Sequence, residues 1–235
     1  MATKRTTKPS AAQIARMAAI AEKLKKQYPD VVCALEWGGQ HGGDRDFLLQ
    51  ESWKLLVMGR LSAQCTDARV NIVCRELFER FPTVHSMADA AVEDIEAVVR
   101  PCGLYRTKAK NIKDACRILV ESHDGIVPDD MESLLALPGV GRKIANLLLG
   151  DVYKKGGVVT DTHCIRICGR LGFYPESLKD PLKVEKILTP LIAEEEQSDF
   201  CHRIVQFGRD TCTARSPSCR ECPLNDLCAY SSKND

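Results

Sequence analysis

Four cysteines near the C-terminus have the type and spacing of metal ligands. Cys212, Cys219, Cys222 and Cys228 form a C-x6-C-x2-C-x5-C array. Four thiolates this close bind either zinc or an iron–sulfur cluster. Four unrelated core cysteines are the alternative, but the loop between them is rich in serine, proline and arginine and offers no core. The array therefore predicts a metal site, and its spacing leaves zinc and a [4Fe-4S] cluster both open.

The other cysteines are spread along the chain, and we expect them to pack in the core. Cys164 and Cys168 lie one helical turn apart but have no second pair nearby. Free cysteine behaves as a small apolar side chain. The same interpretation covers the scattered Cys33, Cys65, Cys74, Cys102, Cys116 and Cys201.

A glycine-rich turn at residues 137–141, with the sequence LPGVG, separates two segments of helical pattern. Its glycines permit a tight turn with outward backbone amides, and the following helix adds the positive end of its dipole. Such a turn binds a phosphate without a basic side chain, which suits recognition of a DNA backbone. A plain helical hairpin is the other interpretation.

Lys143 falls in the first turn of the second of these helices. A cation opposes the helix dipole there, and the same field favours the neutral, nucleophilic amine that Schiff-base chemistry requires. The alternative is an ordinary surface lysine whose stem lies along the protein.

Asp161 directly precedes a helical segment that begins with Thr162 and His163. Its carboxylate can cap that helix, and it can also stabilise positive charge on a sugar or help to deprotonate a lysine. His163 is either a site residue or a structural hydrogen-bonding group.

Helical periodicity dominates the segments that must position these residues. Residues 11–28 form an amphipathic pattern that ends near Pro29, whereas residues 30–52 lose the period and read as a glycine-punctuated linker or loop. Apolar residues recur at helical spacing in later segments, at residues 70–78, 112–119 and 184–191. We expect N-caps at Asp67 and Thr107, and a capping box formed by Asp129 and Glu132. Because the β-branched run at 158–160 is short, an all-α fold is predicted.

Composition narrows the functional classes. The chain has 235 residues and a formal net charge of +1, so any binding to nucleic acid must use local patches. It contains no apolar run long enough to span a membrane and no signal-peptide core at its start, so we expect a cytoplasmic protein.

From about residue 53 to residue 228 the chain resembles the endonuclease III family of helix-hairpin-helix, iron–sulfur DNA glycosylases. The motifs that carry this resemblance are LSAQCTD at 61–67, GLYRTKA at 103–109, LPGVGRK at 137–143, DTH at 161–163 and the four-cysteine loop.

The resemblance implies a helix-hairpin-helix glycosylase fold with a six-helix barrel domain and a second helical domain that carries the cluster loop, with DNA in the groove between them. The four expected regions are a disordered basic tail at 1–10, an N-terminal helix and linker at 11–44 that joins the cluster domain, the barrel with its hairpin at 45–155, and the iron–sulfur domain at 156–235.

The resemblance also implies a reaction. Lys143 matches the family nucleophile, which attacks the anomeric carbon of an extruded nucleoside, expels the base and forms a Schiff base that undergoes β-elimination. Asp161 matches the aspartate that assists the lysine and the sugar cation. A monofunctional glycosylase, which lacks the hairpin lysine, and a non-catalytic DNA-binding module are the competing hypotheses.

Further roles follow from the same resemblance. Gln64 and Leu104 match side chains that fill the hole left by a flipped base. The implied cofactor is a [4Fe-4S] cluster. The implied partner is duplex DNA with oxidised pyrimidines or abasic sites. The resemblance further implies a monomer that is associated with a bacterial nucleoid. The other expected DNA contacts are Gly139, Val140, Gly141, Arg142, His163 and Arg215.

Three departures from the family pattern limit how far substrate preference transfers. Arg60 replaces an apolar helix residue, Thr160 replaces a valine, and the segment at 38–50 is longer than the pattern leads us to expect. A fourth departure, Ser216 where a lysine is frequent, predicts weaker phosphate contact at the cluster loop.

Overall fold

The structure, a computed structural model, describes residues 8–38 and 44–230, and within these ranges it contains helices and no strand. The predicted all-α class is therefore confirmed. Most of the basic tail predicted at 1–10 lies outside the described residues. No helix in the described part of the chain is both long and apolar enough to cross a membrane.

The chain divides into two compact units. A central unit holds residues 33–155, and a terminal unit combines residues up to 32 with those from 156 onward. Residues 33–38 thus belong with the central unit and not with the N-terminal helix. The reason is Asn71, whose side chain accepts a hydrogen bond from the Glu36 amide (3.1 Å) and donates one to the Ala34 carbonyl (3.0 Å).

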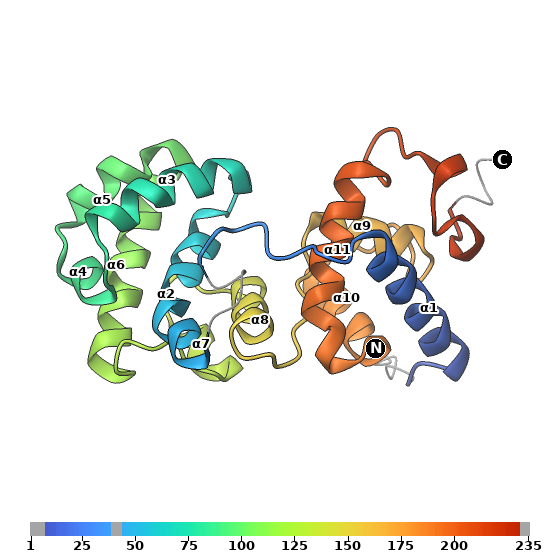
Figure 1. The fold of residues 1–235 in the computed structure, drawn as a ribbon, viewed down its shortest axis with the longest axis horizontal. Helices are drawn as coiled ribbons and strands as arrows, with labels where there is room; N and C mark the ends of the chain where they lie inside the picture. The colour runs from blue at the N-terminus through green and yellow to red at the C-terminus, as the bar shows by residue number, and fades with distance from the viewer. Residues whose placement is uncertain (1–7, 39–43, 231–235) are drawn as a thin grey trace, which may run out of the picture. The chain divides into compact units, whose positions relative to one another are not determined.

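The central unit is a set of helices around one apolar core. Trp53 and Leu77 are buried there, and the Trp53 ring meets Phe78 edge-on at 5.3 Å. Figure 1 shows α6 passing beside α4 and α5, while α2 lies next to α8. In chain order the elements are α2 (Arg45–Leu61), α3 (Asp67–Arg80), α4 (Val84–Asp89), α5 (Val92–Val99), the 3-10 turn η2 (Arg100–Cys102), α6 (Tyr105–Ser122), α7 (Met131–Ala136) and α8 (Arg142–Asp151).

Helix α2 corrects the prediction of a loop or linker through residue 52. The helix begins at Arg45, where the Asp44 side chain accepts a hydrogen bond from the Phe47 amide. From Ser52 to Leu61 nearly every residue is buried, including Gly59. Residues 45–51 are exposed or half-buried, and the part that follows has almost no polar face, so α2 lacks the amphipathic period on which the prediction relied.

Three predicted helix starts are also wrong in detail. Thr66, and not Asp67, caps α3, and Asp130, and not Asp129, caps α7. Helix α6 begins at Tyr105 behind Leu104, so Thr107 lies inside the first turn. Neighbouring polar residues compete for the cap position, and backbone geometry selects one of them.

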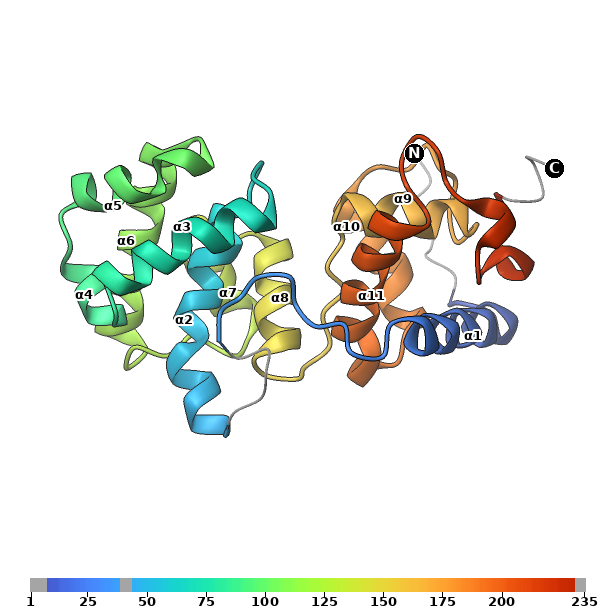
Figure 2. The same ribbon diagram turned by 45° about the horizontal axis from the view of Figure 1, so that its top comes forward.

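The terminal unit packs the first helix of the chain against its last helices. The capping box of Ser10 and Gln13 starts α1, and buried Met17 and Ile20 enter a core shared with Phe200. Figure 2 shows α1 within this group of helices. The elements are α1 (Ala11–Gln27), α9 (Thr162–Arg170), α10 (Pro181–Leu188), the 3-10 turns η3 (Thr189–Leu191) and η4 (Glu194–Glu196), α11 (Gln197–Asp210), and the turns η5 (Cys219–Glu221) and η6 (Asn225–Leu227).

Burial of the scattered cysteines follows the prediction with one exception. Cys65 is half-exposed, because it lies in the loop between α2 and α3. The cysteines that are buried are Cys33, Cys74, Cys102, Cys116, Cys164, Cys168 and Cys201.

Candidate active site and metal centre

The glycine-rich turn joins α7 to α8, so the predicted helical hairpin is present. Gly139 has φ of +78°, and a Cβ there would lie 2.6 Å from Nε of Arg60 and 2.9 Å from Cβ of Asn111. Both the left-handed backbone and the lack of space require glycine at this position. Gly141 caps α8 with nothing within 4 Å of a Cβ position, so its side of the turn is open.

The contacts of Arg60 explain why α2 carries a charged residue within an apolar stretch. Its Nε and Nη2 donate to Oδ1 of Asn111 at 3.2 and 2.9 Å, and its side chain lies directly against Gly139. Partial burial lowers the pKa of its guanidinium. Arg60 and Asn111 therefore pack together against the glycine turn and support it. The sequence signal for this role was a single arginine in an otherwise apolar stretch of helix.

Lys143 is the second residue of α8 and its side chain is exposed. It makes no hydrogen bond or ion pair with any other residue that the structure describes. The next residues, Ile144 and Ala145, are buried and anchor the helix beneath it. Val140 is also buried, whereas Arg142 is exposed. The turn therefore presents an available amine at the positive end of a well-packed helix.

Two loops of the central unit carry the residues predicted to replace a flipped base, and we call them the wedge loops. One is residues 62–66, with Gln64 exposed at φ of 55°, and the other is residues 103–104, with Leu104 61% exposed at φ of 47°. Left-handed backbone is unusual for residues other than glycine and is concentrated at functional positions. An exposed leucine in such a conformation is well suited to insertion between bases.

Asp161 lies in the terminal unit and is the N-cap of α9, as predicted. Its Oδ1 accepts a hydrogen bond from the Cys164 amide at 2.7 Å, and its side chain is half-exposed. His163 is half-buried, with Nδ1 3.2 Å from Nη2 of Arg166 and close to Gly208 of α11. These contacts give His163 a packing role within the unit.

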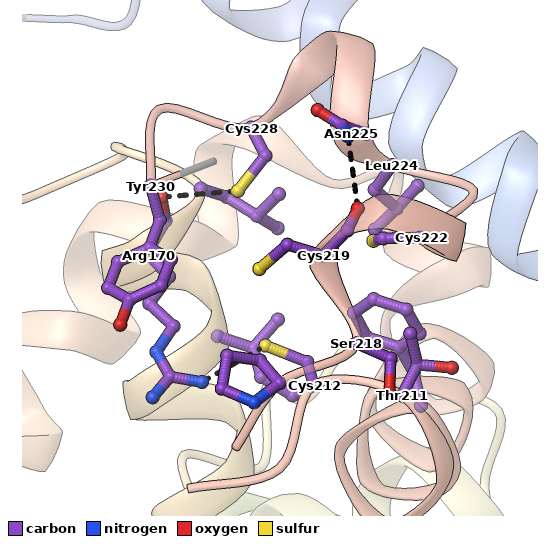
Figure 3. A pocket seen from close by; sticks show the side chains of 14 residues that line it. Arg170, Thr211, Cys212, Ser218, Cys219, Cys222, Leu224, Asn225, Cys228 and Tyr230 are labelled. Atoms are coloured by element: carbon purple, nitrogen blue, oxygen red, sulfur yellow. Dashed lines mark hydrogen bonds between the residues drawn. The ribbon is translucent and has the colours of Figure 1, made fainter. Parts of the chain in front are cut away.

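The four predicted metal ligands surround one pocket in the terminal unit, and we call their loop, residues 212–228, the cluster loop. Figure 3 shows sulfurs of Cys212, Cys219 and Cys228 directed toward a shared space, with Cys222 close by. About 370 Å³ in this pocket is free of atoms, part of it open to solvent. The first and last ligands come from opposite ends of the loop, so a metal bound here closes it.

The surroundings fit an anionic metal–thiolate centre. Arg170 is buried beside the pocket, with Nη1 3.3 Å from Sγ of Cys212, and it also donates to the carbonyls of Thr213 (2.7 Å) and Ala214 (2.8 Å). Burial raises the pKa of the Cys212 and Cys222 thiols. The positive charge of a bound metal would favour their deprotonation.

The exposed part of the cluster loop carries little positive charge. Arg215 and Ser216 are both exposed, and Arg215 is the only basic residue between Cys212 and Cys219.

Comparison with known proteins places these features in one family. A family model described as the HhH-GPD superfamily of base excision DNA repair proteins matches residues 57–194. A second model, described as the iron–sulfur binding domain of endonuclease III, matches residues 212–228, which begin and end at the outer cysteines of the array.

The relatives agree with both models. Endonuclease III of Synechocystis sp. is 42% identical over 206 residues, covering 87% of this chain and 88% of the relative. Endonuclease III of Escherichia coli K12 is 40% identical over 183 residues, covering 78% and 86%.

Two solved structures show the same fold bound to DNA. A non-covalent endonuclease III–DNA complex and a trapped endonuclease III–DNA covalent intermediate each superpose with a TM-score of 0.81 at 38% identity. They cover 94% of this chain and, respectively, 97% and 98% of the solved chains. The hairpin, the iron–sulfur loop and these matches together show that the chain belongs to the endonuclease III family of HhH-GPD base excision DNA repair proteins.

Proposed function

We propose that the chain is a bifunctional DNA glycosylase and abasic-site lyase with Lys143 as its nucleophile. One observation carries the assignment: Lys143 is exposed at the start of α8, immediately behind the glycine turn, and pairs with no described residue. Apart from the exposed Lys154, the other lysines of the same unit are engaged, as Lys113 is with the Ala90 carbonyl and Lys155 is with Asp129. A free amine at a helix N-terminus suits covalent catalysis.

The reaction begins when the neutral amine of Lys143 attacks C1′ of a damaged nucleoside. The glycosidic bond breaks, and its electron pair and a proton leave with the base. A proton then passes from the nitrogen to O4′ as the C1′–O4′ bond breaks, and the nitrogen lone pair forms a protonated imine between Lys143 and C1′. Removal of a proton from C2′ then breaks the C3′–O bond and cuts the strand, and hydrolysis of the imine releases the enzyme.

Asp161 is proposed to support this chemistry with its carboxylate. One of its oxygens caps α9 through the Cys164 amide, which fixes the side chain in one orientation. The second oxygen is then available to accept a proton or to stabilise positive charge on the sugar. Replacement by asparagine preserves the cap and removes the charge, so it separates the two roles.

DNA contact is assigned to backbone amides and to a few side chains. The turn at Gly139, Val140 and Gly141 is open at Gly141, where its backbone suits a phosphate, and Arg142 beside it adds a charge. Gln64 and Leu104 are proposed to occupy the space of an extruded nucleotide. Weaker contacts are assigned to His163 and Arg215.

The four cysteines of the cluster loop are proposed as the ligands of the [4Fe-4S] cluster of this family. When bound, the cluster supplies folding energy to a loop that has almost no core of its own. The protein's own residues define the site, with Arg170 holding one side of the loop.

We further propose that the substrates are oxidised pyrimidines such as thymine glycol in duplex DNA, and that the protein acts as a monomer at the bacterial nucleoid. A damaged pair costs less to open than an intact one, which favours extrusion of the lesion.

Borohydride trapping tests the assignment. The natural protein, Lys143→Ala and the matched control Lys110→Ala are each incubated with duplexes that contain an abasic site or thymine glycol. Lys110 is an exposed lysine of the same unit that pairs with Asp114. We expect a covalent adduct with the natural protein and with Lys110→Ala, and none with Lys143→Ala.

An adduct formed by folded Lys143→Ala rejects the nucleophile. Base release without any adduct from the natural protein indicates a monofunctional glycosylase, and DNA binding without base release indicates a binding module.

A further inference from the structure

Lys108 is a buried lysine that has no role in the proposed reaction. It is fully inaccessible to solvent, although it lies in α6 only four residues after Leu104. Its ammonium donates three hydrogen bonds, to the carbonyls of Leu61 (2.9 Å), Ala63 (2.8 Å) and Cys102 (2.8 Å). Burial lowers the pKa of this ammonium.

These three carbonyls come from the two wedge loops and their edges. Leu61 ends α2, and Ala63 directly precedes Gln64. Cys102 ends η2, two residues before Leu104. The backbone amide of Lys108 also donates to the Leu104 carbonyl at 3.0 Å. One residue therefore contacts the backbone on both sides of the space between the wedge loops.

The wedge loops need such support, because neither is held by a helix ladder at its tip. Gln64 and Leu104 are both left-handed, and this conformation persists in residues other than glycine only when the surroundings enforce it. The hydrogen bonds of Lys108 to Ala63 on one side and to Cys102 on the other hold one loop against the other.

The chemistry of lysine matches this position closely. An ammonium has three N–H donors, and Lys108 has three carbonyl acceptors. All donors are therefore used inside the protein, so Lys108 has none left for a phosphate or for covalent chemistry. Its effect on DNA can only pass through the loops that it holds.

We propose that Lys108 is a positioning residue that couples the two wedge loops, so that Gln64 and Leu104 enter the base stack as one rigid unit when a nucleotide leaves the duplex. The proposal rests on the proposed function, in which these two side chains replace an extruded base. It assigns to Lys108 a share in opening base pairs and none in the bond-breaking steps.

The test compares a paired lesion with an unpaired one. Natural protein and Lys108→Met are given thymine glycol opposite adenine in a full duplex, and the same lesion within a short mismatched bubble, where no pair must be opened. We expect Lys108→Met to slow single-turnover excision from the full duplex about tenfold more than excision from the bubble.

The matched control is Lys113→Met. Lys113 lies in the same helix and also donates to a carbonyl, that of Ala90, but it does not contact the wedge loops. We expect this variant to leave the ratio between the two substrates unchanged. Leu104→Ala should shift the ratio as Lys108→Met does, and combining the two substitutions should add little further.

Equal slowing on both substrates overturns the proposal, because it makes Lys108 a residue of general stability. Lys108→Gln retains two N–H donors without the charge, so it is the second variant if Lys108→Met does not fold, and it should show a smaller shift in the same direction. Borohydride trapping at a preformed abasic site in the bubble reports Lys143 chemistry separately. If the natural protein gives no adduct there, the proposed function fails. The coupling of the loops is then tested without chemistry, by measuring base-pair opening with a fluorescent base opposite the lesion. In that assay Lys108→Met and Leu104→Ala should reduce opening to a similar extent, and normal opening by Lys108→Met overturns the proposal.

Discussion

The wedge loops of the central unit and the cluster loop of the terminal unit are both irregular, and a buried cation holds each of them. Lys108 donates to three carbonyls around the wedge loops, and Arg170 donates to two carbonyls and one sulfur of the cluster loop. The two loops differ in whether protein groups alone complete the arrangement around the cation. The donors of Lys108 are all satisfied by the protein, whereas Arg170 lies beside a pocket lined by four cysteines whose arrangement is completed by a bound metal.

This difference indicates which parts of the site depend on the cofactor. The wedge loops and the glycine turn belong to the central unit and are held by protein groups alone. The cluster loop has one buried apolar side chain, Leu224, to contribute to the core of its unit. We therefore expect the loss of the cluster to disorder the cluster loop and to leave the wedge loops in place.

Removal of a cluster ligand is the strongest test of this contrast and should have the largest effect. Four thiolates bound to a metal contribute on the order of 10 kcal/mol to folding, so Cys222→Ser should abolish the visible iron–sulfur absorption and expose amides throughout residues 212–228. Hydrogen exchange in α2, α3 and α6 should stay as slow as in the natural protein. Fast exchange of the Cys65 and Lys108 amides, which donate to the Ser62 and Leu104 carbonyls, would show that the wedge loops also depend on the cluster.

Replacement of Arg170, the buried cation of the cluster loop, should destabilise the terminal unit less than removal of a cluster ligand. Arg170→Leu leaves the carbonyls of Thr213 and Ala214 without their donor and removes a positive charge beside Cys212. The unfolding free energy of the terminal unit should fall by about 2 kcal/mol, with faster loss of iron to a chelator. Arg209→Leu, on the exposed part of α11, is the control. Iron retention equal to that of the natural protein would mean that the thiolates alone define the loop.

The glycine turn offers a third case, in which packing replaces the buried cation. Gly139→Ala places a Cβ against Arg60 and Asn111 in a left-handed backbone, so it should cost about 2 kcal/mol and weaken DNA binding. Gly141→Ala enters open space at φ of −103° and should change stability by only a few tenths of that value. Thermal unfolding of the two variants measures the difference, and equal losses would contradict it.

A surface group should have the smallest effect, and it is sensitive to pH. The Ser133 amide donates to the Asp130 carboxylate at 2.9 Å, which lowers the pKa of Asp130 from its ordinary value of 3.8. The stabilising effect of this cap is present above that value and is lost as the pH falls through the lowered pKa. The chemical shift of the Ser133 amide should follow that transition, and Asp130→Asn, which still caps but does not titrate, should abolish it.

Local patterns predicted the chemistry of this protein better than its boundaries. The structure has the four cysteines around one pocket, the glycine turn between two helices, Lys143 in the first turn of α8 and Asp161 as the cap of α9, as the sequence predicts, because each depends on short spacing or on a helix terminus. The start of α2 is hard to recognise in the sequence, because residues 45–51 are exposed or half-buried while Ser52–Leu61 is buried on nearly all sides, so neither part shows an apolar face opposite a polar one.

Residues that act through three-dimensional contact gave almost no signal in sequence. Lys108 looks like any lysine of an amphipathic helix until its acceptors, 6 to 47 residues away in the chain, are known. Arg60 was noticed only as an exception to an apolar pattern, and its role depends on Asn111 and Gly139, which lie in other segments. Such roles can be recognised only once the folded structure is known.

The division of the chain also determines when each part can form. The central unit is one continuous stretch, so all of its contacts are available once residue 155 has left the ribosome. The terminal unit must wait for the end of the chain, because Lys23 of α1 bonds to Asp226 and to the Pro223 carbonyl, about 200 residues later. During synthesis α1 therefore remains without its apolar partners while the wedge loops of the central unit fold. The cluster loop can close around a metal only after Cys228, its last cysteine, has been synthesised.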